Sequence, residues 1–422
     1  MKRRTLVLGG SAIVGAGAVL GGAALSFGRV FADRPRPGAT RQRLEPDPRR
    51  ILDLAPGFSY SVVDRQLERM DDGYRVPRRP DGMACFTAAS GAWVLLRNHE
   101  LTRAPADADY LEGRALPSPY DPQMFGGVTR VELEPSSLRR LRTNLVLTGT
   151  SRNCAGGVSP WGWLTCEEST EPGHGYVFAC SVEAREAAPP QKIAAYGRCR
   201  REAAAVDPAT NIAYLTEDEV DSCFYRFVPH AKDRPFEGRL EALCVTGRPR
   251  FNTARAARQG EALPVSWVAL DDPEAQRETL REQAQARGAA LIRRAEGLWL
   301  DRRRAYICSS TGGPAEAGQI FVLELDAPGS LSLLTESVDR ERLDMPDNIT
   351  VGPSGVLYLI EDGPGADYLR ALLPDGTLLD IARNAASEGE MAGCCFSPDG
   401  RVLFANLQED GITVAIRGPF PG

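Results

Sequence analysis

One recurring pattern constrains the fold of this sequence more than any other feature. Each copy has an acidic residue, a short apolar strand, a turn with Asp, Pro, Gly or Arg, and a second strand with a central aromatic residue and a polar tail. Five copies begin at Asp81, Glu202, Glu296, Asp347 and Glu390, and residues 153–168 (NCAGGVSPWGWLTCEE) form a sixth. A β-unit repeated about every 40–50 residues is typical of a β-propeller. The sequence therefore predicts an all-β, six-bladed β-propeller.

The acidic residues of these copies predict a metal site. The innermost strand of a propeller blade lines the central channel, and the second strand returns to the same face. The acidic first residues of the copies and the polar tails after their second strands would therefore meet at one mouth of the central channel. The tails include Glu168, Glu217, Asp218, Glu361 and Asp362. So many carboxylates would repel one another unless multivalent cations neutralise them. The alternative is that they are turn residues facing solvent, but their recurrence at one phase of the repeat favours cations.

Cys154 begins the sixth copy and is the most distinctive candidate ligand. A thiolate beside carboxylates is unfavourable unless a metal holds it deprotonated. Mixed sulfur and oxygen donors suit a transition metal such as iron, whereas groups with oxygen alone suit calcium. The alternatives are a buried apolar cysteine or one half of a disulfide, for example with Cys166.

Arg294 lies two residues before Glu296, so in an extended segment the two side chains would share a face. An arginine in that place can bind phosphate with two parallel hydrogen bonds beside a metal cluster. The alternative is a solvated charge at the end of a helix, because residues 273–294 carry the one clear helical pattern. We expect that stretch to be a short helical insertion.

The N-terminal region predicts export. Residues 1–32 contain Arg3-Arg4, a run rich in Gly and Ala, and Val30-Phe31-Ala32 as a cleavage site, and they resemble a twin-arginine signal peptide. A retained anchor is the alternative. We expect a linker at 33–50 and a catalytic propeller at 51–422. The twin-arginine export machinery would transport the protein, and after cleavage of the signal peptide it would be a periplasmic or secreted monomer that does not associate with the membrane.

Composition and motifs exclude several other function classes. The formal net charge of −6 argues against nucleic acid as a partner. Three scattered histidines do not form a histidine-based zinc site, and no nucleophile-elbow, P-loop or dinucleotide motif lies in a supporting context.

Several segments resemble the PhoX-type alkaline phosphatase family. They include RNHE (97–100), NCAGGVSPWGWLTCEE (153–168), REAAAVDPATNIAYLTED (201–218), EGLW (296–299), PDNITVGPSG (346–355) and SPDGRVLFANLQ (397–408). The resemblance runs from about residue 50 to the C-terminus. It implies a six-bladed propeller exported by the twin-arginine route, in which a cluster of iron(III) and calcium ions, one iron bound by a cysteine thiolate, hydrolyses phosphate monoesters.

The resemblance also implies roles for individual residues. Cys154 matches the iron-binding cysteine, Glu202 and Glu296 match glutamate ligands, Glu168 matches the second Glu of the CEE motif, a metal ligand, and Arg294 matches the arginine that contacts phosphate. The channel-mouth argument adds three calcium ligands, Asp347, Glu361 and Asp362.

Two departures from the family pattern affect what can be expected of the site. Arg201 stands where relatives commonly have His, and PWGWLTCEE is one residue shorter than the more frequent form. Either change could alter phosphate access or the metal cluster.

The sequence thus predicts an exported phosphatase that acts on small phosphorylated substrates, with Arg294 and Glu296 as its catalytic residues. Two alternatives stay open. One is a calcium-dependent propeller that hydrolyses lactones or other esters, for which Cys154 would be dispensable. The other is a non-catalytic binding propeller that keeps calcium for structure alone.

Overall fold

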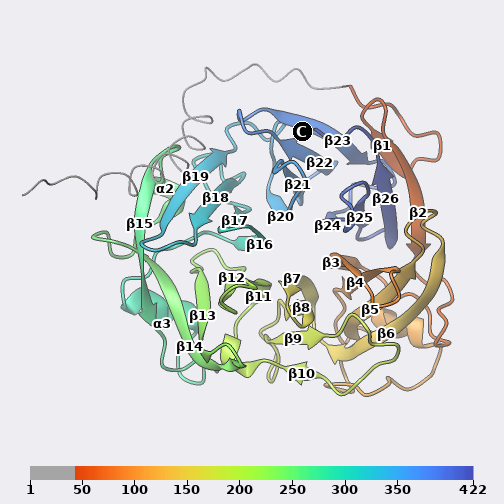
Figure 1. Ribbon diagram of the computed structural model, residues 1–422, viewed down its shortest axis with the longest axis horizontal. Coiled ribbons are helices and arrows are strands. Elements are labelled where there is room, and N and C mark those ends of the chain that lie inside the picture. The colour runs from red at the N-terminus through yellow and green to blue at the C-terminus, as the bar shows by residue number, and fades with distance from the viewer. Residues whose placement is uncertain (1–42, 422) are drawn as a thin grey trace, which may run out of the picture.

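The computed structural model describes residues 43–421, which form a ring of antiparallel β-sheets around a central axis (Figure 1). This arrangement confirms the all-β, propeller-like fold predicted from the repeats. The predicted signal peptide and most of the predicted linker lie outside the described residues. No helix in the described part of the chain has the length and apolar character needed to cross a membrane.

Four sheets contain four or five strands each. One consists of β3 (Pro80–Thr87), β4 (Trp93–His99), β5 (Gly126–Leu133) and β6 (Arg140–Thr150). The next consists of β7 (Asn153–Ser159), β8 (Gly162–Glu167), β9 (Val177–Cys180) and β10 (Gln191–Lys192). A third consists of β20 (Pro346–Val351), β21 (Leu357–Glu361), β22 (Tyr368–Leu372), β23 (Leu378–Asn384) and β1 (Leu52–Leu54). The fourth consists of β24 (Met391–Phe396), β25 (Leu403–Leu407), β26 (Ile412–Arg417) and β2 (Ser59–Arg65).

The remaining sheet has nine strands. Its first part is β11 (Arg201–Val206), β12 (Ala213–Glu217), β13 (Tyr225–Ala231), β14 (Arg234–Val245) and β15 (Ala262–Ala269). Its second part is β19 (Ser330–Glu336), β18 (Gln319–Glu324), β17 (Arg304–Ser309) and β16 (Ala295–Asp301). Strand β15 pairs with both β14 and β19 and so joins the two parts.

The strands that follow the predicted repeat starts line the centre of the ring. In chain order they are β3, β7, β11, β16, β20 and β24; each contacts the next, and β24 contacts β3. The two ends of the chain close this ring, because β2 pairs with β26. A buried ion pair supports the closure: Arg97 of β4 donates to Asp64 of β2 over 2.5 and 3.1 Å, and also to Thr413 of β26.

Helices are few and short. The predicted helical insertion at 273–294 contains only α3 (Leu280–Ala286), which begins at a capping box formed by Thr279 and Glu282. Turns precede that cap, and Gly288 follows the helix at a φ of 88° that ends it. The other helical segments are α2 (Thr253–Ala256), η1 (Pro105–Leu111) and η2 (Ala194–Tyr196). The insertion is therefore helical only in its middle.

Candidate metal centre

The structure places five of the predicted starts at equivalent points of the inner strands. Each is the second residue of its strand; they are Asp81, Cys154, Glu202, Glu296 and Asp347. The pairing between the first and second strands skips this residue in all five. A bulge of this kind re-aims a side chain and is common next to active sites. The repeated bulge thus turns five potential ligands away from the ladder.

Small residues after two of these ligands let the inner strands approach closely. A Cβ atom on Gly82 would lie 2.6 Å from the Cα of Ala155, and one on Gly297 would lie 2.5 Å from the carbonyl oxygen of Asp347. Both distances are too short for any side chain, so glycine at these positions brings neighbouring ligand-bearing strands together.

Of each acidic pair at the end of a second strand, only the second residue reaches the mouth. The first residue is held within its own blade: Glu167 accepts from Gly175 N over 2.8 Å, and Glu217 and Glu361 pair with Arg281 and Arg370 over 3.1 and 2.6 Å. The residues that follow are Glu168, Asp218 and Asp362. The structure therefore does not bring Glu361, a predicted calcium ligand, to the cluster.

Two overlapping groups of side chains could each hold a cation. The first is Cys154, Glu168 and Glu202, and the second is Glu202, Glu296 and Asp347; within each group one ligand atom per residue lies within 4.8 Å of the others. Glu202 belongs to both, and its Oε1 lies 3.2 Å from the sulfur of Cys154. Its Oε2 is buried without a hydrogen-bond partner. A buried orphan oxygen among carboxylates and a thiol fits a bound cation.

The pKa shifts of these side chains also favour a bound cation. Burial, and then the charges of the neighbouring acids, raise the pKa values of Glu202, Glu296 and Asp347 well above their usual range. Burial and the nearby charges of Asp81 and Glu202 likewise raise the pKa of Cys154. Without cations these groups keep their protons, whereas a metal would displace the protons and take the thiolate and carboxylates as ligands.

Arg294 lies beside the second group, as its spacing from Glu296 predicted. Its guanidinium donates to the two carboxylate oxygens of Asp218 over 2.7 and 3.0 Å and contacts Glu296 Oε1 at 3.0 Å. Ser310 donates to the same Glu296 oxygen over 2.7 Å. The hydrogen bonds to Asp218 raise the pKa of Arg294. Burial alone would raise the pKa of Asp218, but the hydrogen bonds from Arg294 and the charges of Arg294 and Arg200 together outweigh burial, so the pKa of Asp218 is lowered. Arg294 is thus a fixed, partly exposed cation at the mouth.

The same backbone hydrogen bond recurs at all six inner strands and shows which of their residues are equivalent. The N–H of each tail residue donates to the carbonyl of a residue near the start of the inner strand, in the pairs Glu100 to Arg79, Glu168 to Arg152, Asp218 to Arg200, Ser310 to Arg294, Asp362 to Met345 and Gln408 to Glu390. Glu390 therefore matches the arginines, which lie two residues before the ligands. Its predicted equivalence with the other acidic starts was wrong by two residues.

Sequence reasoning missed three of these arginines, Arg79, Arg152 and Arg200. Arg152 contacts Glu100 and Glu168, both at 2.8 Å, and Arg200 contacts Glu168 and lies 3.5 Å from Asp218. The signal was present, because an arginine stands two residues before Asp81, Cys154 and Glu202 as it does before Glu296. Only the last of these four spacings was recognised.

The two departures from the family pattern lie away from the mouth. Arg201 is fully buried and donates to the backbone oxygens of Thr216 and Tyr196 over 2.9 and 3.0 Å. The shortened tryptophan segment turns between β7 and β8, at the opposite end of β7 from Cys154. Neither change obstructs the cluster.

The cysteines form no disulfides. All ten lie between residues 43 and 421 and are free, and Cys166 is buried in a hydrophobic cluster between its own sheet and the sheet that begins with β11. The interpretation of Cys154 as half of a disulfide is therefore wrong, and Cys154 is instead a free thiol in contact with Glu202.

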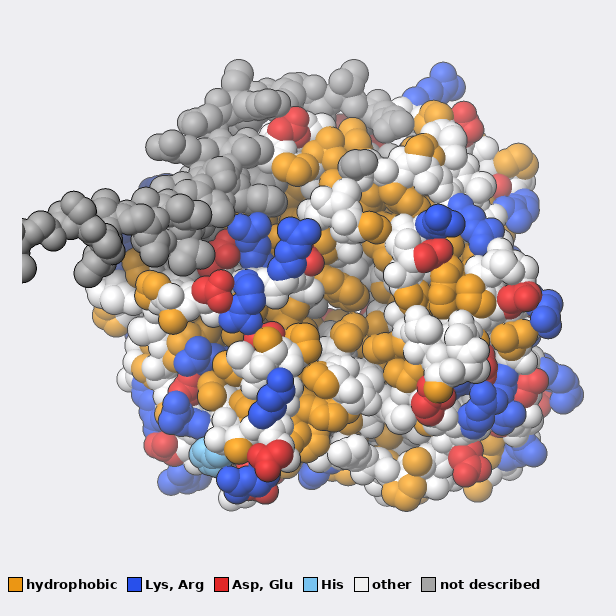
Figure 2. Space-filling model, viewed as in Figure 1, with side chains coloured by type: hydrophobic (Ala, Val, Ile, Leu, Met, Phe, Trp, Pro, Cys, Tyr) orange, Lys and Arg blue, Asp and Glu red, His pale blue; other side chains and the backbone are white. Residues whose placement is uncertain are grey.

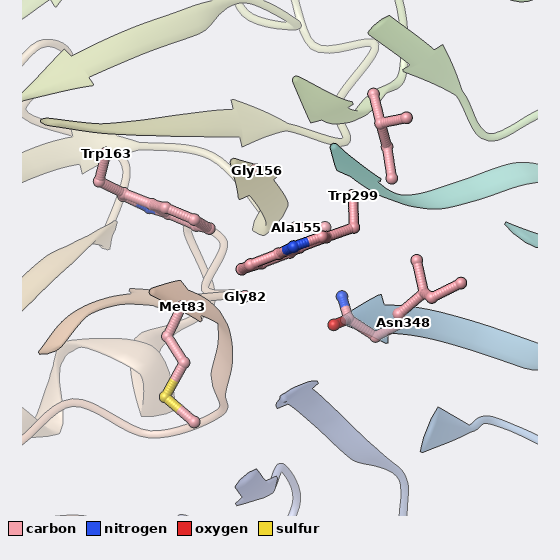
Figure 3. A pocket seen from close by; sticks show the side chains of 9 residues that line it. Gly82, Met83, Ala155, Gly156, Trp163, Trp299 and Asn348 are labelled. Atoms are coloured by element: carbon pink, nitrogen blue, oxygen red, sulfur yellow. The ribbon is translucent and has the colours of Figure 1, made fainter. Parts of the chain in front are cut away.

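The channel beneath these ligands is closed. Figure 3 shows the indole of Trp299 lying across the space between Gly82 and Asn348, with Met83 and Trp163 nearby. The remaining cavity measures about 10 Å³, which is room for about one water molecule. On the face seen in Figure 2, hydrophobic side chains surround the centre and charged ones lie farther out. Trp299 therefore fills much of the space between the inner strands beneath the candidate ligands.

Comparisons with known proteins identify the family of this chain. A model of the family "Alkaline phosphatase PhoX" matches residues 40–411. The chain belongs to the PhoX family. Among solved structures, Pseudomonas fluorescens PhoX in complex with vanadate, a transition state analogue, superposes with a TM-score of 0.66 at 16% identity, over 90% of this chain and 97% of that one. A gluconolactonase of Xanthomonas campestris, XC5397, covers 87% of this chain and 98% of its own at 12% identity, but its TM-score of 0.44 is too low to bear on function. No curated protein matches significantly. Membership of the PhoX family confirms the resemblance found in the sequence and supports a phosphatase.

Proposed function

We propose that this PhoX-family chain hydrolyses phosphate monoesters at the acidic mouth of the propeller. One observation carries the proposal: Arg294, fixed by Asp218, lies against Glu296, which shares a candidate metal group with Glu202 and Asp347. An arginine beside clustered carboxylate ligands is a suitable arrangement for binding a phosphoryl group.

The residues present suit iron(III) and calcium. The thiolate of Cys154 with Glu202 would provide the mixed sulfur and oxygen donors that favour iron, and Asp347 and Asp362 would provide oxygen donors for calcium. When bound, the cations would neutralise the carboxylates and polarise a phosphoryl oxygen. Glu168 is the third member of the first group.

The protein's own residues have separate tasks in the proposed reaction. Asp218 holds the guanidinium plane of Arg294 through two hydrogen bonds, so that plane is oriented before substrate arrives. Arg294 would donate to the phosphoryl oxygens and stabilise the negative charge that develops on them. Ser310 and Arg294 together fix Glu296. Trp299 fills much of the space below.

We also propose six blades, counting the nine-stranded sheet as two blades joined through β15. The closed ring of inner strands supports this count. Export by the twin-arginine machinery, residence in the periplasm or outside the cell, and a monomeric state are proposed from the sequence of residues 1–32 and the single propeller.

The test is activity together with metal content. Protein purified from the periplasm should contain iron and calcium and should hydrolyse an artificial phosphate monoester, with inhibition by vanadate. Arg294→Gln should keep both metals but lose most of the rate, by roughly 10²–10³-fold. Hydrolysis of a lactone but not of the monoester, or a protein without bound metal, would reject the proposal.

A further inference from the structure

The charged side chains at the mouth fall into two groups, and the first is internally paired. Arg152, Arg200 and Arg294 alternate with Glu100, Glu168, Asp218 and Glu296, so that each arginine contacts carboxylates at two points of the mouth. Both oxygens of Glu168 are engaged, one by Arg152 and one by Arg200. This arginine arc therefore carries its own counter-charge.

The second group has no such partner. Asp81, Glu202, Asp347, Asp362 and Glu390 form no ion pair with any residue between 43 and 421. Met345 and Glu390 occupy the backbone positions that Arg79, Arg152, Arg200 and Arg294 occupy on the other inner strands. Of the two strands without an arginine at this position, one carries Asp347 and the other directly follows Glu390, and Asp362 follows the strand paired with the first of them.

We propose that the guanidinium groups of Arg152 and Arg200 take the place of bound cations at Glu100, Glu168 and Asp218, and that the metal centre is confined to the unpaired carboxylates together with Cys154 and Glu296. A cation placed between Glu168 and Asp218 would lie against the charge of Arg200 and would be repelled by it. Glu168 is then a positioning residue for two arginines and not a metal ligand. The inference rests on the proposed metal centre but not on phosphatase activity.

The direct test replaces one guanidinium and measures calcium. Arg200→Gln removes the charge between Glu168 and Asp218, Arg200→Lys keeps it, and Arg234→Gln removes an exposed, ion-paired arginine far from the mouth. Each protein is stripped of metal, dialysed against calcium, and analysed for bound calcium and for the thermal midpoint.

We expect Arg200→Gln to bind about one more calcium ion per chain than the wild type. We also expect its midpoint to fall without calcium and to rise with calcium concentration more steeply than that of the wild type. Arg200→Lys and Arg234→Gln should match the wild type. Unchanged calcium binding in a folded Arg200→Gln protein would overturn the inference, whereas a wild type that binds no metal would instead overturn the proposed metal centre.

A second variant decides the matter if Arg200→Gln does not fold. Glu168→Gln should keep the wild-type amounts of iron and calcium, because its carboxylate is already neutralised by Arg152 and Arg200. Glu202→Gln should lose metal and is the matched control, since Glu202 is also buried and has an unpartnered oxygen. Loss of a metal ion from Glu168→Gln would show that Glu168 is a ligand and would overturn the inference.

Discussion

Two cysteines separated by twelve positions give the sharpest test of the metal centre. Cys154 contacts Glu202 at the mouth, whereas the side chain of Cys166 is fully buried in a hydrophobic cluster that includes Leu164 and Tyr225. Serine in place of Cys154 exchanges a soft thiolate for a poor neutral donor, so the variant should lose iron and phosphatase activity together. Cys166→Ser should keep both.

Thermal stability should respond the other way, with a loss in Cys166→Ser and almost no change in Cys154→Ser. Serine at position 166 buries a hydroxyl among apolar side chains, which costs about 1–3 kcal/mol if the hydroxyl finds no partner. For residues 43–421, the entropy of unfolding is about 0.8 kcal/mol/K, so this cost lowers the thermal midpoint by about 1–4 °C. Cys154→Ser breaks no disulfide and should leave the midpoint of the metal-free protein within about 1 °C of the wild type.

Metal analysis, the hydrolysis rate on an artificial monoester, and midpoints measured on chelator-treated protein separate these effects. Iron retained in Cys154→Ser, or lost equally from both variants, would refute the assignment of Cys154 as a ligand.

Three further predictions follow from the structure. Burial, and then the charge of Glu168, raises the pKa of Asp81 to about 7, so the folded metal-free protein holds a proton that the unfolded chain releases near pH 4. Its stability should therefore fall as pH rises from about 4 to 7, and a midpoint that rises over this interval would contradict the argument. Asp64→Asn leaves the buried Arg97 without its counter-charge and should cost about 3–5 kcal/mol in denaturant unfolding; a loss below about 1 kcal/mol would mean that the pair does not support ring closure. Changing Arg3 and Arg4 to Lys should leave unprocessed precursor in the cytoplasm, and normal export would reject the twin-arginine assignment.

The repeat made the inner strands predictable from the sequence. Acidic starts such as Asp81 and Glu202 recur before apolar strands with the same turn chemistry, and the structure places them at equivalent bulges. The sequence leaves three interpretations of Cys154 open, because spacing alone cannot tell a metal ligand from a buried apolar cysteine or a disulfide partner. Only the position of Glu202, 48 residues later, makes the distinction.

The tails were less predictable, although the physical rule was available. Successive residues of a strand face opposite sides, so only one residue of each acidic pair can reach the mouth. Glu361 was included with Asp362, yet its carboxylate pairs with Arg370, a residue of β22 that the repeat pattern does not specify. Glu390 was misaligned because an acidic residue replaces an arginine there, and only the backbone hydrogen bond to Gln408 reveals the shift.

Ring closure by β2 and β26 has a consequence for how the protein matures. The proposed ligands Cys154 and Asp347 lie on strands far apart in the chain, β7 and β20, and β26 lacks its partner until both β2 and β26 are present. Such non-local pairing makes assembly slow, because long loops must close before their contacts form. A nascent chain that has not reached residue 417 cannot complete the ring. Metal binding would therefore follow synthesis of the whole propeller, and a bound metal would indicate that β2 and β26 have paired.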